Sequence, residues 1–157
     1  VQDALRCREQ SGCSDLMLGR GSVADPGLAL AVRAAVADGV PHSEAVPAEL
    51  PPAVSWAQLL PHLQRFWLMV CRDLTPNQRG GRLKQWLNLM RRRYPEAENA
   101  FQSVRVLTKQ HLVAEWLEQE CERYGVEFVL QKQELAAYEN RAPEAALILD
   151  SALAGRY

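Results

Sequence analysis

The densest group of side chains that could bind a ligand is cationic and lies in the segment GGRLKQWLNLMRRRYPEAENAFQSVRVL, from Gly80 to Leu107. From Pro76 to His111 the chain has eight Lys and Arg residues and two acidic residues, a net charge of +6. The rest of the chain has ten cations and seventeen acids, a net charge of −7, so the overall charge of −1 conceals a strong asymmetry. Arg predominates over Lys, and its planar guanidinium matches phosphate oxygens. This pattern indicates a polyanion as a possible ligand.

A helix predicted from about Gly81 to Arg93 would present most of these cations. Its apolar stripe has the i, i+3, i+4, i+7 spacing of a buried face and consists of Leu83, Trp86, Leu87 and Met90. Because Trp86 lies at the centre of that stripe, we interpret it as a core residue and not as a platform for a base. The alternative for the basic face is a solvated helix surface without a ligand, and charge alone does not choose between the two.

The sequence gives little support for a metal-binding site or for a membrane-spanning segment. The cysteines do not show metal-ligand spacing and are predicted to be reduced thiols; they are Cys7, Cys13, Cys71 and Cys121. The histidines are equally isolated at His42, His62 and His111. There is no apolar run near 18 residues and no signal-peptide pattern, so we expect a soluble, cytoplasmic protein without a metal site.

The elements before residue 39 resemble a piece of a repeating β/α architecture. We predict a helix over Val1–Gln10, a short buried strand over Asp15–Leu18, a Gly19-Arg20-Gly21 turn, and a helix from Asp25-Pro26 to about Asp38. A single parallel strand cannot pair its own backbone or cover both of its faces. We therefore expect that part of this architecture lies upstream of the chain.

The region after residue 39 is predicted to be a Pro-rich linker followed by helices. Residues 39–54 form the predicted domain boundary, and Ser55 with Gln58 is a capping box that starts a helix to about Arg72. Pro61 should kink this helix or move its start to that position. The further predicted elements are a helix over Glu96–Val104, a helix over Thr108–Tyr124 ended by Gly125, a β-prone run over Val126–Leu130 and a weak helix over Pro143–Ala154.

Two separated stretches resemble the tRNA-dihydrouridine synthases, flavoenzymes that reduce uridines of tRNA, and in particular their bacterial uridine-16 subfamily. The first is SGCSDLMLGRGSVADP, from Ser11 to Pro26, which is similar to the family's last barrel strand and its Gly-Arg turn. The second is RLKQWLNLMRRRYPEAENAFQSVRVL, from Arg82 to Leu107, which is similar to the C-terminal helical domain. Together they cover most of the chain up to Leu117, and the match fades beyond Glu118.

The resemblance implies a mostly α chain that contains the last βα unit of a TIM (β/α)8 barrel followed by a helical bundle domain. The implied domains are residues 1–38 for the barrel end, 39–54 for the linker, 55–124 for the tRNA-binding helices, and 125–157 for an extension of unknown role. The barrel would bind FMN, with NADPH as reductant, and Gly19 and Arg20 would contact the FMN phosphate. The matching tRNA contacts are Arg82, Lys84 and Arg105, while Leu89 occupies a position that is aromatic in relatives. By the same resemblance, the full-length protein would be a monomer that reduces a D-loop uridine of tRNA, which is U16 in this subfamily.

The family's proton donor is a Cys in an Asn-Gly-Cys-Pro loop, and none of the four cysteines lies in such a sequence. We therefore expect no catalytic residue in this chain and no activity of the chain alone. Two alternatives from other classes stay open. One is a non-catalytic helical RNA-binding module, and the other is a protein-interaction domain whose basic helix docks an acidic partner.

Overall fold

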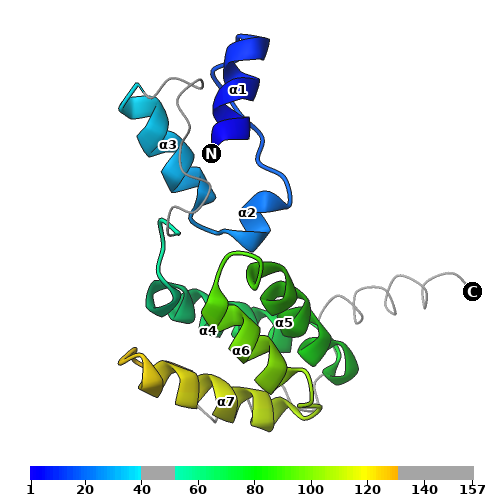
Figure 1. Ribbon diagram of the computed structural model, residues 1–157. Coiled ribbons are helices and arrows are strands. Elements are labelled where there is room, and N and C mark those ends of the chain that lie inside the picture. The colour runs from blue at the N-terminus through cyan, green and yellow to red at the C-terminus, as the bar shows by residue number, and fades with distance from the viewer. Residues whose placement is uncertain (40–51, 131–157) are drawn as a thin grey trace, which may run out of the picture.

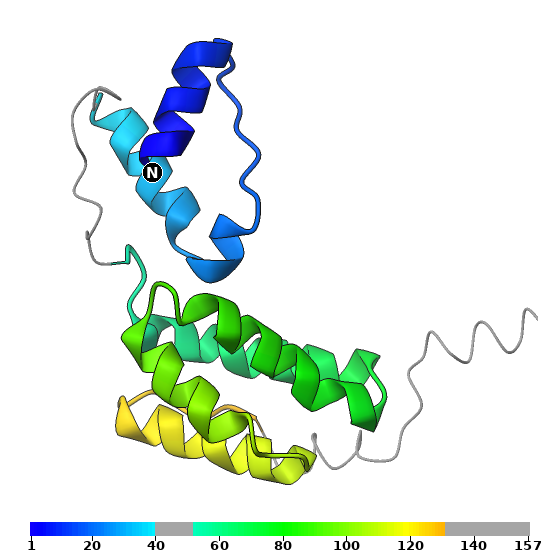
Figure 2. The same cartoon turned by 45° about the vertical axis from the view of Figure 1, so that its right-hand side comes forward.

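The computed structural model describes residues 1–39 and 52–130, and within these ranges the chain is helical, without a strand. The helices are α1 (Gln2–Ser11), α2 (Gly21–Ala24), α3 (Leu28–Ala37), α4 (Trp56–Asp73), α5 (Pro76–Met90), α6 (Pro95–Val104) and α7 (Gln110–Arg123). Figures 1 and 2 both show α4 to α7 stacked against one another, with α1 and α3 standing apart from that stack and α2 beside α5. The mostly α prediction is confirmed, and the predicted helix over Pro143–Ala154 lies outside the described residues.

Helix α4 begins where its sequence signal predicts. The Ser55 hydroxyl accepts from the Gln58 N–H at 3.3 Å, and the Gln58 side chain accepts from the Ser55 N–H at 2.8 Å. These reciprocal bonds satisfy two of the N–H groups that a helix start leaves unpaired. The helix then continues through Pro61 without a break, so the expected shift of its start to Pro61 is wrong.

The four C-terminal helices enclose a single apolar core. Each contributes one face at helical spacing, as amphipathic helices of a bundle do. The largest fully buried apolar side chains are Trp67, Tyr94, Leu59, Leu60, Leu63, Leu83, Leu87, Met90 and Leu117. Trp56 is also buried, and its Nε1 donates to Glu120 Oε1 at 3.0 Å, which joins the first turn of α4 to α7. Trp86 is half-buried and packs against this core from its edge, with its ring centroid 4.8 Å from that of Phe66, so its interpretation as a core residue is confirmed only in part.

The predicted strand at Asp15–Leu18 is wrong for this chain. Residues 15–19 are not assigned to any element, and the side chain of Met17 is 99% exposed. A strand is stabilised by pairing with another strand, and no described segment of this chain supplies one. The β-prone run at Val126–Leu130 likewise forms no strand.

Several helix boundaries differ from the prediction because the residues at the N-caps are not the expected ones. Helix α3 begins at Leu28 with Gly27 as its N-cap, so Asp25 is not the N-cap. The Asp25 Oδ1 instead accepts from the Gly27 N–H in the turn before the helix. The turn after Arg20 closes into the short helix α2. Helix α5 begins at Pro76 and not at about Gly81, with Thr75 as N-cap and Pro76 in the first position, the arrangement that proline favours.

Candidate nucleic-acid interface

Two of the three predicted tRNA-contacting residues present free charge to solvent. The Arg82 guanidinium is exposed on α5 and bonds only locally, to Gln85 Oε1 at 3.2 Å. Arg105 caps the end of α6, is exposed, and bonds to Gln102 Oε1 at 3.0 Å. Both contacts are between neighbours on one helix, and such pairs hold a guanidinium only weakly. Both side chains can therefore turn toward a ligand at low cost.

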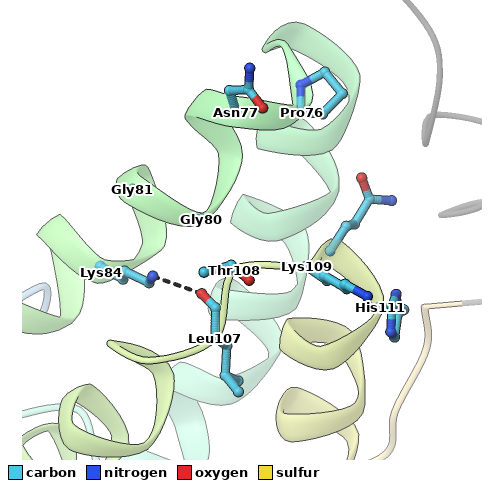
Figure 3. A pocket seen from close by; sticks show the side chains of 10 residues that line it. Pro76, Asn77, Gly80, Gly81, Lys84, Leu107, Thr108, Lys109 and His111 are labelled. Carbon is cyan, nitrogen blue, oxygen red and sulfur yellow. Dashed lines mark hydrogen bonds between the residues drawn. The ribbon is translucent and has the colours of Figure 1, made fainter.

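Lys84, the third predicted contact, has a structural bond as well. Its Nζ donates to the carbonyl oxygen of Leu107 at 2.7 Å and so joins α5 to the loop between α6 and α7 (Figure 3). An ammonium has three N–H donors, so this bond leaves two of them for another acceptor.

Lys84 crosses a groove of about 610 Å³ between the first half of α5 and the start of α7. Figure 3 shows Lys84 reaching across it to Leu107, with Lys109 and His111 on the far side. The groove is lined by Pro76, Asn77, Gly80, Gly81, Lys84, Leu107, Thr108, Lys109, Gln110 and His111. None of these ten lining residues is acidic, so the groove has the electrostatic character that an anion requires.

Three arginines of the predicted basic surface contact other groups of the protein, and they differ in burial: Arg79 is buried, Arg93 is half-buried and Arg91 is exposed. Arg79 is only 1% exposed; its Nε donates to the Leu74 carbonyl at 2.9 Å and its Nη1 to the Gln110 side chain. Arg91 lies over the ring of Phe101, with its Cζ 5.2 Å from the centroid, and its Nη1 is 3.5 Å from Glu98 Oε2.

Arg93 belongs to a junction between the N-terminal helices and the bundle. Its Nε donates to Asp25 Oδ2 at 3.1 Å, and the Tyr94 hydroxyl donates to Asp25 Oδ1 at 3.4 Å. Nearby, Trp86 Nε1 donates to the carbonyl oxygen of Val23 at 3.0 Å. Burial and the neighbouring Asp25 carboxylate raise the pKa of Tyr94 to about 12. Sequence reasoning missed this junction, because residues 68 or 69 apart carry no local signal of contact.

The predicted flavin-phosphate residues lie in the turn that precedes α2. Gly19 is exposed and accepts two hydrogen bonds from Ser22, from its N–H at 3.0 Å and its hydroxyl at 2.8 Å. Arg20 is exposed, and its guanidinium makes no hydrogen bond or ion pair with the described residues. A Cβ placed at Gly19 would meet nothing within 4 Å, so the space beside this turn is open.

Two other features are absent from the described residues. No group of three or more His, Cys, Asp or Glu side chains is placed to hold a metal ion. No described helix is both long enough and apolar enough to cross a membrane.

The sequence is similar to that of several curated proteins. It is 45% identical over 123 residues to the tRNA-dihydrouridine(16) synthase of Aquipseudomonas alcaligenes, covering 78% of this chain and 32% of that protein. The enzyme of the same name from Pseudomonas putida is 43% identical over 105 residues, covering 67% of this chain and 29% of that protein. The one from Escherichia coli K12 is 32% identical over 106 residues, covering 68% and 29%. The chain therefore spans about a third of the length of the relatives it matches.

No family model matches the chain, and no solved structure does. The curated matches agree with one another in name, and they extend over two thirds or more of the chain. The aligned region is the C-terminal part of those proteins. The chain thus belongs to the tRNA-dihydrouridine(16) synthase family and corresponds to the C-terminal part of its members.

Proposed function

We propose that this chain is the tRNA-binding part of a flavin-dependent tRNA-dihydrouridine synthase that reduces a D-loop uridine, U16, to 5,6-dihydrouridine. The observation that carries the proposal is the cationic surface of α5 and the α6–α7 loop. Arg82 and Arg105 are exposed and held only by neighbours on their own helices, and Lys84 lies in a groove without acidic lining residues. Such groups suit the phosphates of a folded RNA, which is gripped largely through its backbone and shape.

The turn around Arg20 is proposed to hold the phosphate of FMN, which when bound supplies the hydride for the reduction. The residues fit that group. Arg20 has a guanidinium without a partner among the described residues, and Gly19 has open space beside it, so a phosphate could approach the backbone closely. NADPH is the proposed reductant, and the protein is proposed to act in the cytoplasm as a monomer.

The junction at Asp25 connects the N-terminal helices, which include the proposed flavin-side turn, to the proposed RNA-binding helices. Asp25 directly follows α2, the short helix that begins after the proposed flavin-side turn, and Arg93 follows α5, so their ion pair connects α2 to the proposed RNA-binding helix. The domain boundary at residues 39–54 stays a prediction.

The test is the affinity of unmodified tRNA for the purified chain across a salt series. We expect Arg82→Ala and Arg105→Ala each to weaken binding and to flatten the slope of log affinity against log salt by about 0.7 to 0.9, the value of one phosphate contact. Arg65→Ala is the matched control, because Arg65 is an exposed cation on α4 and does not line the groove. If all three variants bind like the parent, the basic surface is a solvated helix face and the proposal fails.

The tRNA affinities, together with a second measurement of flavin retention by the complete enzyme, separate the alternatives. A non-catalytic RNA-binding module would give the same binding results but would leave Arg20→Ala without an effect on flavin retention by the complete enzyme. A protein-interaction domain would give no tRNA affinity above that of any other polyanion. If the complete enzyme with Arg20→Ala keeps its flavin affinity, Arg20 faces solvent and does not bind the FMN phosphate.

A further inference from the structure

Helix α5 contains two adjacent glycines, Gly80 and Gly81, at its fifth and sixth positions, and both line the groove. Glycine is among the least favourable residues in a helix interior, because it gives up the most backbone freedom on folding. A buried contact often explains such a glycine, since a neighbouring backbone leaves no room for a Cβ.

Internal packing does not explain these two. A Cβ added at Gly81 would meet nothing within 4 Å, and one at Gly80 would only touch the flexible end of Lys84 at 4.0 Å. The space that the missing side chains leave therefore belongs to the groove. Its shape is consistent with a ligand whose own backbone passes close to the helix.

The groove offers that ligand hydrogen-bond donors from two helices. Both α5 and α7 begin at it, and neither start has a side-chain cap, so the positive ends of both helix dipoles face the groove. Helix α5 begins with Pro76, which has no N–H, and its Gln78 N–H donates to the Thr75 carbonyl at 2.9 Å, so the backbone donors of the groove are mainly those of His111 and Leu112 in the first turn of α7. Lys84, Lys109 and His111 add donors, and Asn77 and Thr108 add an amide and a hydroxyl. With no acidic residue among the ten that line it, this is a set of groups for anionic oxygens.

We infer that this groove holds a phosphodiester segment of the RNA, with Lys109 and the N-terminal turn of α7 as phosphate contacts and with Gly80 and Gly81 as the surface along which the sugar-phosphate backbone lies. The inference rests on the proposed tRNA-binding function and extends it to Gly80, Gly81 and Lys109, to which the family resemblance assigns no contact. It also gives Lys84 two tasks: its bond to Leu107 holds the groove open in one shape, and its remaining donors face the anion.

Gly81→Ala tests the inference most directly, because its two expected effects have opposite signs. The added methyl group raises the helix propensity of α5, so the unfolding temperature should rise by a few degrees. The same methyl group stands where the RNA backbone is inferred to pass, so the dissociation constant of unmodified tRNA should increase by about fivefold or more. Asn88→Ala is the matched control: it raises helix propensity at an exposed position of α5 outside the groove and should leave affinity unchanged.

Lys109→Ala is the second variant, since Lys109 is exposed and its removal does not threaten folding. It should flatten the salt slope of tRNA affinity by about 0.7 to 0.9. Arg82→Ala and Arg105→Ala, measured beside it, separate the two proposals. If Arg82→Ala and Arg105→Ala weaken tRNA binding while Gly81→Ala and Lys109→Ala bind tRNA as tightly as the parent, the groove does not bind the RNA and the proposed function stands. If none of the four changes affinity, both proposals are overturned.

Discussion

Arg79 and Arg82 are one helical turn apart on α5, and their side chains have different roles. Arg79 is buried in the bundle. It donates to the carbonyl of Leu74, which is the C-cap of α4, and to the side chain of Gln110, the first residue of α7. Arg82 is exposed and bonded only to Gln85. The difference follows from the spacing: Arg79 lies four residues before the buried Leu83, on the same face of the helix, and Arg82 does not.

Replacement of Arg79 by Ala should therefore destabilise the protein, because it leaves the Leu74 carbonyl and the Gln110 side chain without their donor. We expect a loss of about 3 kcal/mol in the free energy of unfolding. Urea denaturation followed by circular dichroism measures it. Arg82→Ala, which removes the same charge from the surface, should change the stability by less than about 0.5 kcal/mol. Equal effects of the two substitutions would contradict the burial argument.

The buried thiols predict how stability depends on alkaline pH. Burial raises the pKa of Cys71 to about 12 and that of Cys121 to about 11, from an ordinary value of 9.0. Because the folded state keeps these protons and the unfolded state releases them, the stabilising effect is complete below pH 9 and is lost as pH rises toward 11 and 12.

The free energy of unfolding should fall by on the order of 2 to 4 kcal/mol between pH 9 and 11. Urea titrations at several pH values, with a reductant present, measure this. Cys71→Ala and Cys121→Ala should each remove part of the pH dependence, since the pKa of both thiols is raised, and Tyr94, whose pKa is raised to about 12, should supply a further part above pH 10. Cys7→Ala, at an exposed position, is the control. A parent protein whose stability is flat across this range would contradict the prediction.

At the scale of the elements, one carboxylate links two groups of helices. Asp25 lies in the turn between α2 and α3 and accepts from Gly27, Arg93 and Tyr94. The two side chains of its ion pair are 13% and 29% exposed, so the pair is shielded from water and is worth more than a surface pair. The half-buried Trp86 adds a second link through the Val23 carbonyl.

Asp25→Ala should loosen α1 to α3 from the bundle without unfolding the bundle itself, since the apolar core of α4 to α7 does not depend on Asp25. Amide hydrogen exchange should show protection in α3 falling by about 1 to 3 kcal/mol while protection in α4 and α7 is kept. Asp38→Ala, at the exposed end of α3, should change neither. Equal loss of protection in all helices would mean that the chain unfolds as one unit.

At the scale of the whole molecule, the charge asymmetry persists in the fold, but fewer cations face solvent than the sequence suggests. Of the eight between Pro76 and His111, Arg79 is buried and Arg93 pairs with Asp25. Six others remain half-buried or exposed on α5, α6 and the adjoining loops: Arg82, Lys84, Arg91, Arg92, Arg105 and Lys109. The cationic surface that faces solvent is therefore narrower than the segment's charge of +6 implies.

The chain alone should not reduce uridine. None of its four cysteines lies in the Asn-Gly-Cys-Pro loop that the family resemblance requires for proton donation, and of the proposed flavin site it contains only the turn at Gly19 and Arg20. An assay with FMN, NADPH and unmodified tRNA should give the background rate, while tRNA binding persists. Turnover by the purified chain would show that a catalytic group has been overlooked.

The sequence by itself determined the helical elements, their apolar faces and several of their ends, because caps and hydrophobic periodicity are local properties of the chain. The capping box of α4, the positive-φ Gly125 after α7 and the burial of Leu83, Leu87 and Met90 all agree with it. It also carried the family resemblance that the curated relatives confirm.

Only the tertiary structure decided which cations are free and which are used internally, because a guanidinium looks the same in sequence whether its partner is water or Asp25. It also decided that Asp15–Leu18 forms no strand, since a strand depends on a neighbour and no described residues provide one. The groove at Gly81 is likewise a feature that only the tertiary structure decided. It is bounded by residues 76–84 of α5 and by residues 107–111, segments more than twenty residues apart in the sequence, which the Lys84 bond and the packing of α5 against α7 bring together.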